Sequence, residues 1–447
     1  MNKKIWETGV IVADDLTGAM DAGVQCIGTN EVEVIVDSKC FHTELIKKGK
    51  FLSVNTQSRQ VRPEKAMKIV SKLVESLGTI ESPFFLYKKV DSTLRGNLVV
   101  EIWKLVQFYR PKIVVFTPAI PSLGRKVIGG KLFVNGKNLT NTPYIKEISG
   151  SSVENIASMF KKSWPGCNVF PVPPLVSFEV LKSLIERKTD VVIADASEEE
   201  HLEHLSKVGN RLEKEGHKIM WSGSSGLLKG LQAQHVFNNS KSYDLNKSTK
   251  GPFLVVSGST RKIANKQIAK AVLADPQCLS ISCQYISGPV HPSNKCNDTP
   301  LFLWKTNKFV ELGGSETTDE IKDIIDRARN SLLGGENVYI CSVSNDKNRS
   351  ISDYVSVVFS QVVKRILLAI RVDNPTLILV GGDTANLILT NLGVTKTSLV
   401  QDIEPYIPLG IILDGMVSGS FLVTKAGGFG DSDTVKRIVH KLTGIKN

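Results

Sequence analysis

The chain has 447 residues, of which 41% are hydrophobic and 22% are charged, and its formal net charge is +12. This composition is typical of a globular protein, and the length allows two or three domains. Lysines and arginines occur singly or in short pairs, so the charge gives no reason to expect a nucleic-acid partner. No run of about 18 apolar residues predicts a membrane span. The N-terminal residues also lack the apolar core of a signal peptide, so we expect a cytoplasmic protein.

The seven cysteines are scattered, and no Cys-x-x-Cys pair or Cys/His cluster has the spacing of a zinc site. We therefore expect reduced thiols and no structural zinc. The sequence leaves the identity of any metal ligand unknown.

Residues 1–237 alternate between short apolar runs and helical patterns, which predicts a parallel sheet with crossover helices. The strand-like runs are 8–13, 31–37, 51–54, 83–87, 112–117, 167–171, 190–195 and 218–222. The helical patterns are 19–26, 63–77, 97–108 and 177–187. Within 129–139, the pair Asn135-Gly136 predicts a tight hairpin turn.

Three of these strands run into polar segments with charged side chains. Asp14 and Asp15 follow the first strand, and one of the two is expected to cap the next helix. Arg59 lies in the polar segment after 51–54. The strand 83–87 leads into a dense cluster of polar side chains, which are Lys89, Asp91, Ser92, Thr93 and Arg95. Arginine and lysine suit a carboxylate, and hydroxyls with an aspartate suit a polyol. The alternative is a surface turn with ordinary salt bridges.

The segment 238–252 is polar and poor in apolar residues, and it is the best linker candidate. Beyond it the alternating pattern restarts, with three loops that each join an apolar strand to a helix N-terminus. These loops are Ser257–Thr260, Gly381–Thr384 and Thr424–Asp433. Free backbone N–H groups at a helix N-terminus favour an anion, and glycines allow a phosphate to approach closely. The third loop lacks the Gly-Lys-Ser/Thr of a Walker loop. Together the three loops predict a nucleotide site.

These patterns predict an α/β fold with two α/β domains whose mostly parallel sheets face a central cleft. The N-terminal domain is expected over 1–237, the linker over 238–252 and the C-terminal domain over 253–447.

Four motifs resemble the four-carbon acid sugar kinase family, in the family's order. They are Val12–Ala19, Lys88–Asn97, Gly381–Thr384 and Thr424–Asp431. The resemblance implies an ATP-dependent kinase that phosphorylates the 4-hydroxyl of D-threonate, an erythronate or a 3-oxo-tetronate. It also implies an N-terminal domain that binds the sugar acid and a C-terminal domain that binds ATP.

The resemblance also implies roles for individual residues. The substrate set is Asp14 or Asp15, Arg59, Lys89, Asp91 and Ser92, with Arg95 in the same cluster. The ATP set is Ser257 or Ser259, Gly381, Gly382, Asp383, Thr384, Gly427 and Gly428. The hypothesis is that Arg59 and Lys89 hold the substrate carboxylate and that Mg²⁺ bridges the ATP phosphates. Asp15 and Asp383 are both candidates for the base.

Three segments depart from the family's usual pattern, namely Met20, Thr260–Lys262 and 141–155, which leaves the choice of substrate open. A dehydrogenase is disfavoured because no Gly-x-Gly-x-x-Gly follows the first strand. A non-catalytic sugar-acid or nucleotide sensor, and a kinase for another hydroxy acid, remain alternatives. The partners expected are a small sugar acid and ATP, and a homo-oligomer is allowed.

Overall fold

The computed structural model describes residues 6, 8–28, 31–80, 84–148, 155–234, 251–286, 301–306, 318–342, 349–370 and 375–443. The chain divides into two compact units, Met1–Lys241 and Ser242–Asn447. The expected linker 238–252 lies almost wholly outside the described residues. Each unit has its own sheet and its own core of buried apolar side chains.

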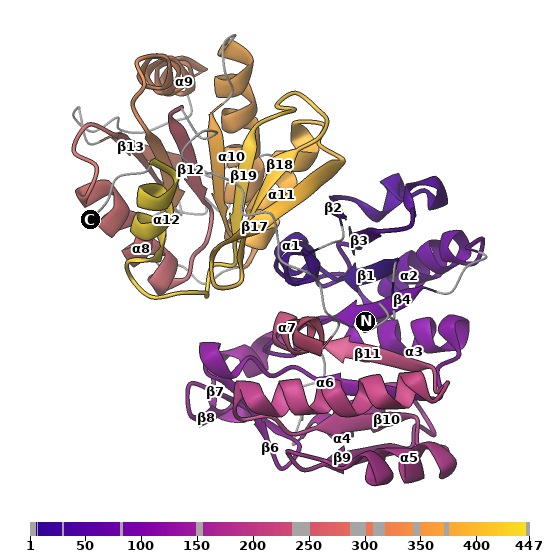
Figure 1. Ribbon diagram of the computed structural model, residues 1–447. Helices are drawn as coiled ribbons and strands as arrows, with labels where there is room; N and C mark the ends of the chain where they lie inside the picture. Colours follow the sequence, from indigo (N-terminus) through magenta and orange to yellow (C-terminus); the bar gives the residue numbers. More distant parts are fainter. Residues whose placement is uncertain are drawn as a thin grey trace, which may run out of the picture. The chain divides into compact units, whose positions relative to one another are not determined.

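The first unit is built on a sheet of eight parallel strands (Figure 1). Helices cover both of its faces, so a strand such as Gly9–Ala13 is buried along its whole length. In spatial order the strands are β2 (Glu31–Ile35), β3 (Lys50–Asn55), β1 (Gly9–Ala13), β4 (Phe85–Lys89), β11 (Ile219–Gly223), β5 (Ile113–Thr117), β10 (Val191–Ala194) and β9 (Val169–Val172).

Seven described α-helices belong to this unit. They are α1 (Leu16–Gly23), α2 (Pro63–Leu77), α3 (Leu98–Tyr109), α4 (Ile156–Ser163), α5 (Phe178–Glu186), α6 (Glu199–Lys214) and α7 (Ser225–Gln234). Helix α2 begins with Pro63 in its first turn and buries Ala66, Val70, Leu73 and Leu77, which lie three or four residues apart. Helices α2, α3 and α4 pack in one row, and α1, α7, α6 and α5 pack in another.

The expected hairpin is part of a small antiparallel sheet of β6 (Arg125–Ile128), β7 (Lys131–Val134) and β8 (Lys137–Asn138). Asn135 and Gly136 join β7 to β8 with φ of 50° and 78°. Two successive positive φ angles are what a two-residue type I′ turn requires, so the predicted turn is confirmed.

The second unit has a mixed sheet whose five central strands are parallel. Antiparallel hairpins add β14 at one edge, and β18 and β17 at the other. In spatial order the strands are β14 (Leu301–Thr306), β13 (Leu279–Ile286), β15 (Val338–Ser342), β12 (Phe253–Ser257), β16 (Thr376–Val380), β19 (Phe421–Lys425), β18 (Ile407–Ile412) and β17 (Lys396–Glu404). The expectation of α/β folding with mostly parallel sheets is confirmed.

Five described helices flank this second sheet. They are α8 (Lys262–Leu273), α9 (Thr318–Leu333), α10 (Arg349–Ala369), α11 (Gly382–Asn391) and α12 (Thr434–Thr443). Helices α8 and α12 pack together, and α9, α10 and α11 pack side by side in a separate group (Figure 1).

Two helices begin three residues earlier than their patterns predicted. Helix α1 begins at Leu16 because the carboxylate of Asp15 accepts a hydrogen bond from Gly18 N at 2.8 Å. Asp15 is therefore the capping residue of the pair. Helix α11 begins at Gly382, directly after Gly381 with its φ of 108°. Both loops are consequently shorter than expected.

Gly209 allows α6 to pack against the sheet. A Cβ at this position would lie 2.2 Å from Cη2 of Trp221, a fully buried side chain on β11. We expect Gly209→Ala to lower the free energy of unfolding by about 1–3 kcal/mol, because the indole or the helix must move. Chemical denaturation measures the change, with Lys207→Ala on the exposed face of α6 as the control. An unchanged midpoint for Gly209→Ala would contradict this account of the packing.

Candidate functional site

Three neighbouring strands of the first unit bring the expected polar segments to one edge of the sheet. Ala13 ends β1 and is paired in register with Asn55 of β3 and with Lys89 of β4. The segments that follow these strands carry the predicted substrate residues. The carboxyl edge of a parallel sheet is the usual place for ligand-binding residues in α/β proteins.

Arg59 lies at the centre of this cluster and binds both aspartates of the first motif. Its Nε and Nη2 donate to Asp14 at 2.9 and 2.8 Å. Its Nη1 and Nη2 donate to Asp15 at 2.5 and 2.8 Å. All three nitrogens of the guanidinium therefore contact protein carboxylates, which is a different arrangement from the substrate-carboxylate clamp expected from the sequence.

The electrostatics of this cluster follow from burial and from these contacts. Burial by itself would raise the pKa of Asp14, but Arg59 and Lys88 outweigh it and leave the pKa below its usual value. Burial would likewise lower the pKa of Arg59, but Asp14 and Asp15 hold it well above its usual value. Asp14 and Arg59 are therefore charged at neutral pH.

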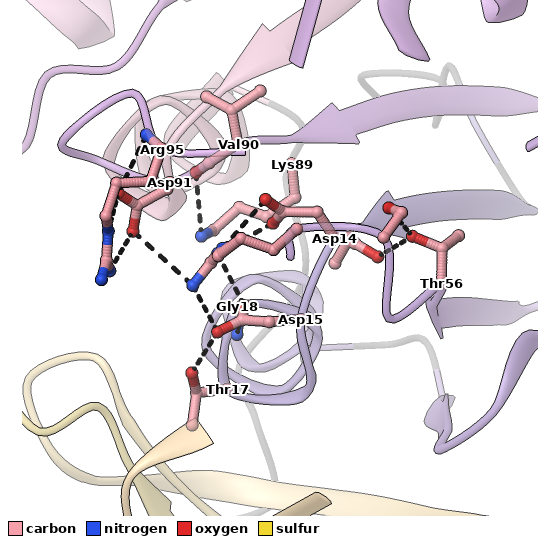
Figure 2. Close-up of polar contacts among 12 residues, drawn as sticks. Asp14, Asp15, Thr17, Gly18, Thr56, Lys89, Val90, Asp91 and Arg95 are labelled. Atoms are coloured by element: carbon pink, nitrogen blue, oxygen red, sulfur yellow. Dashed lines mark hydrogen bonds and ion pairs between the residues drawn. The ribbon is translucent and has the colours of Figure 1, made fainter. Parts of the chain in front are cut away.

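A second arginine holds the other acidic residue of the cluster (Figure 2). Arg95 binds Asp91 through Nε and Nη2, both at 2.8 Å, and also contacts Glu147 at 3.1 Å. The hydroxyl and the backbone N–H of Thr93 donate to Asp91 as well. Although burial opposes ionisation, Arg95 and Arg59 keep the pKa of Asp91 well below its usual range. Ser92 is 5% exposed in the same loop.

Gly96 brings this loop against the first motif. Its φ is +91°, and a Cβ there would lie 2.8 Å from Oδ2 of Asp14 and 3.2 Å from Cγ of Arg59. A side chain at this position would therefore push the two motifs apart.

Lys89 makes no described hydrogen bond to Asp14 or Asp15, the two carboxylates that Arg59 binds. Its Nζ lies 3.3 Å from Oδ1 of Asp21 on α1 and donates to the carbonyl of Val90 at 3.2 Å. Burial raises the pKa of Asp21 to about 7, and the positive charge of Lys89 offsets part of that rise. Asp21 was not among the site residues expected from the sequence. Its position four residues after Thr17, on the same face of α1, was the available signal.

A fully buried ion pair lies next to this edge. Nζ of Lys88 is 2.7 Å from Oε2 of Glu101 on α3, and neither side chain is exposed. Lys88 also donates to the carbonyl of Lys89 at 2.8 Å. Burial of Glu101 was not predictable from the sequence, because a glutamate at this position of the helical pattern is equally typical of an exposed surface.

In the second unit, the three glycine-containing loops converge at the carboxyl ends of β12, β16 and β19. A Cβ on Gly258 would lie 2.1 Å from Oγ1 of Thr384. A Cβ on Gly427 would lie 2.2 Å from Oγ of Ser259. Gly381 N donates to the carbonyl of Lys425 at 2.9 Å. The loops therefore contact each other, as the expectation of one site requires.

Neighbouring helices fix the shape of these loops. Gln267 on α8 donates through Nε2 to the carbonyls of Phe429 and Asp431 at 3.0 and 2.6 Å. Oγ of Ser356 on α10 lies 2.9 Å from Oγ1 of Thr384. Gly382 and Asp383 form the first turn of α11, and Asp383 is exposed. Gly428 follows Gly427 in the loop after β19.

The strand ends beside these loops carry polar atoms without partners. Among the described residues, the hydroxyls of Ser257 and Thr424 are buried and have no hydrogen-bond partner. Lys425, the last residue of β19, is 0% exposed, and burial lowers the pKa of its amine to about 7. Glycines that admit no side chain, together with unpaired buried donors, fit the phosphate groups of a nucleotide.

In the described part of the chain, no group of three or more His, Cys, Asp or Glu side chains is placed to hold a metal ion. No helix in the same part is both long and apolar enough to cross a membrane.

Two family models match the chain, one in each unit. A sugar-binding N-terminal domain matches residues 9–231, and a nucleotide-binding C-terminal domain matches residues 254–435. A D-threonate kinase of Bordetella bronchiseptica is 26% identical, over 96% of this chain and 95% of its own. A D-erythronate kinase of Heliobacterium modesticaldum is 23% identical, over 98% of both chains. The chain belongs to the four-carbon acid sugar kinase family.

A relative named for a different substrate matches this chain to a similar extent. A 3-oxo-tetronate kinase of Actinobacillus succinogenes is 22% identical, over 95% of this chain and 97% of its own. Relatives acting on different acids thus match almost equally well, and identity alone does not choose a substrate.

Solved structures share the fold of this family member. A Salmonella typhimurium protein has a TM-score of 0.71 and 19% identity, over 96% of this chain and 98% of that one. A Haemophilus influenzae protein has a TM-score of 0.67 and 17% identity, over 97% and 100%.

The raised pKa of Asp21 makes the stability of the protein depend on pH. Its proton stabilises the folded state fully below about pH 4, and this contribution is lost as the pH rises to about 7. In Asp21→Asn the loss is absent, so the variant should gain stability relative to wild type between pH 4 and 7, by at most about 4 kcal/mol. Above pH 7 the difference should stay level.

Denaturant titrations of the full chain at a series of pH values measure this difference. Glu64→Gln, at an exposed position on α2, is the matched control and should follow wild type. A constant difference between Asp21→Asn and wild type from pH 4 to 8 would show that Asp21 does not hold a proton in the folded state.

Proposed function

We propose that this protein is an ATP-dependent kinase that phosphorylates the 4-hydroxyl of a four-carbon sugar acid, D-threonate, an erythronate or a 3-oxo-tetronate. The proposal is carried by the three contacting loops of the second unit, Ser257–Thr260, Gly381–Thr384 and Thr424–Asp433, which we call the glycine cradle. Buried hydroxyls in these loops have no hydrogen-bond partner among the described residues. The first unit of the same chain has a cluster of charged and polar side chains at one edge of its sheet. Relatives named for such kinases match nearly the whole length of the chain.

In this proposal the sugar acid binds at the carboxyl edge of the first unit, within a domain spanning 1–237. Asp14 and Ser92 bind substrate hydroxyls, while Arg59 and Lys89 provide positive charge for the carboxylate. The contacts of Arg59 with Asp14 and Asp15 hold the guanidinium in a fixed orientation, so that little ordering is needed when substrate binds. Asp91 and Arg95 keep the loop after β4 in place.

ATP binds in the domain spanning 253–447, where it supplies the phosphoryl group. Backbone N–H groups of the loop containing Gly427 and Gly428 would stabilise charge on that group. Ser257, Ser259 and the segment Gly381–Thr384 complete the cradle. Mg²⁺ would bridge the ATP phosphates, because this ion is held largely by phosphate oxygens and water and needs only one or two protein carboxylates.

The acceptor hydroxyl needs a group that takes its proton, and Asp15 and Asp383 remain the two candidates. Both oxygens of Asp15 already accept hydrogen bonds, from Arg59, Thr17 and Gly18. Asp383 is exposed on the first turn of α11. A substrate hydroxyl would therefore have to compete with these donors for the oxygens of Asp15.

The competing proposal is a sensor that binds a sugar acid and a nucleotide without turnover. ATP consumption separates the two, measured against a panel of four-carbon acids with Mg²⁺ and with a chelator. A kinase is expected to turn over one acid, and to stop when the chelator is present. Nucleotide binding with no turnover on any acid would favour the sensor or a kinase for another hydroxy acid.

Arg59→Lys tests the centre of the first unit's cluster. An ammonium group cannot hold two carboxylates bidentately, so Asp14 and Asp15 should lose their fixed geometry. We expect kcat/KM for the sugar acid to fall about 100-fold, roughly 3 kcal/mol of transition-state stabilisation, while ADP affinity stays unchanged. Arg62→Lys, at an exposed position three residues away, is the control. Equal kcat/KM for the two variants would remove Arg59 from the proposed site.

A further inference from the structure

Lys425 is a buried lysine at the end of β19, within the expected nucleotide loop Thr424–Asp433. The strand-end residues Ser257, Val380 and Lys425 are aligned in register across β12, β16 and β19. The carbonyl of Lys425 accepts from Gly381 N, and its Nζ donates to the carbonyl of Ala426 at 2.9 Å. The residue therefore joins two of the three loops of the cradle.

No carboxylate compensates this amine among the described residues around it. The strands on either side, β16 and β18, carry no titratable side chain. Helix α11, which also packs against β19, carries only Asp383, and that residue is exposed. Burial is the one cause that moves the pKa of Lys425, and no charged neighbour contributes. The other buried lysines in described parts of the chain are all paired with a carboxylate: Lys50 with Glu33, Lys88 with Glu101 and Lys89 with Asp21.

A buried amine without a counter-charge is unfavourable in its protonated form, because it has lost water and gained only one backbone acceptor. Ser257 nearby leaves a buried hydroxyl without a partner, so this end of the sheet has further unused hydrogen-bonding capacity. An anion in the cradle would supply the missing charge. It would also stabilise the protonated form of the amine.

We propose that Lys425 binds a proton when a nucleotide phosphate enters the cradle, so that nucleotide binding and protonation of this lysine are coupled. This inference rests on the proposed nucleotide site and adds to it a residue and a pH dependence. In the free protein the amine is largely neutral above neutral pH. In the complex the phosphate charge keeps it protonated, and the lysine becomes a charge partner of the phosphate.

The proposal requires the pKa of Lys425 to be higher in the nucleotide complex than in the free protein, so binding takes up protons. At pH 8 roughly nine in ten free molecules hold a neutral Lys425, given its pKa of about 7. The second pKa of a phosphate is roughly 6, so at pH 8 the phosphate of the nucleotide itself binds almost no protons. Binding at pH 8 should therefore consume more than about half a proton. Affinity should fall with rising pH above about 7, by up to about tenfold per pH unit.

Isothermal titration calorimetry with Mg²⁺ and ADP tests the proposal on the full chain. Titrations in two buffers of different ionisation enthalpy, from pH 6.5 to 9, give the number of protons taken up. Lys425→Arg should bind ADP without uptake, since arginine is always protonated. Lys425→Met should also take up no proton on binding ADP. Its affinity for ADP at pH 6.5 should be at least about tenfold weaker than that of wild type, because a rise of one unit in the pKa of Lys425 on binding corresponds to a tenfold change in affinity. Lys266→Met removes an exposed lysine from α8 and should match wild type.

The outcomes separate this inference from the function on which it rests. Uptake that rises through a midpoint near pH 7 in wild type, and is lost in both Lys425 variants, supports the coupling. ADP binding without uptake, uptake with a different midpoint, or uptake that persists in the variants overturns it and leaves the nucleotide site standing. No ADP binding at any pH overturns both proposals. Absence of uptake in wild type overturns the coupling whichever variant folds, and one folded Lys425 variant is enough to assign the proton.

Discussion

The buried contact between Arg59 and the paired carboxylates of Asp14 and Asp15 is the interaction on which the first unit's edge depends. Moving one arginine and two aspartates out of water costs free energy that only close, well-oriented ion pairs can offset. The structure meets this condition with four short hydrogen bonds from one guanidinium. The same contact joins the loops after β1 and β3, whose backbones also bond through the carbonyl of Asp14. Removing Arg59 would leave two neighbouring carboxylates without their shared partner.

The charged cluster of the first unit and Lys425 of the second are buried in different ways. In the first unit, arginines and lysines at the sheet edge form ion pairs with carboxylates of the protein itself. The Lys88–Glu101 pair is fully buried. In the second unit, Lys425 has only a backbone carbonyl and a lowered pKa. A weakly charged, hydroxyl-rich ligand suits the first arrangement, because it adds little charge. A phosphate suits the second, because it brings the charge that the protein lacks.

The organisation of the site was predictable where local sequence patterns carry it. Apolar runs followed by Asp14-Asp15, Arg59 or Gly381–Thr384 place these residues at strand ends, and parallel strands bring their carboxyl ends to one edge. Residues acting through long-range packing were not predictable. Asp21, Glu101 and Gln267 lie on helices whose patterns give no sign of what they contact, and each acts on a segment distant in the sequence.

The sequence by itself determined the α/β class, the mostly parallel sheets, the tight turn at Asn135-Gly136 and the polar or glycine-containing loops that follow the strands. These depend on periodicity, glycine and short motifs, which are local properties of the chain. Tertiary structure alone decided that Arg59 is held by two protein carboxylates and that Asp21 has a pKa of about 7. It also decided that Lys425 is buried without a counter-charge. The reason is that pKa values and ion pairs depend on desolvation and distance, which arise only when distant segments pack together.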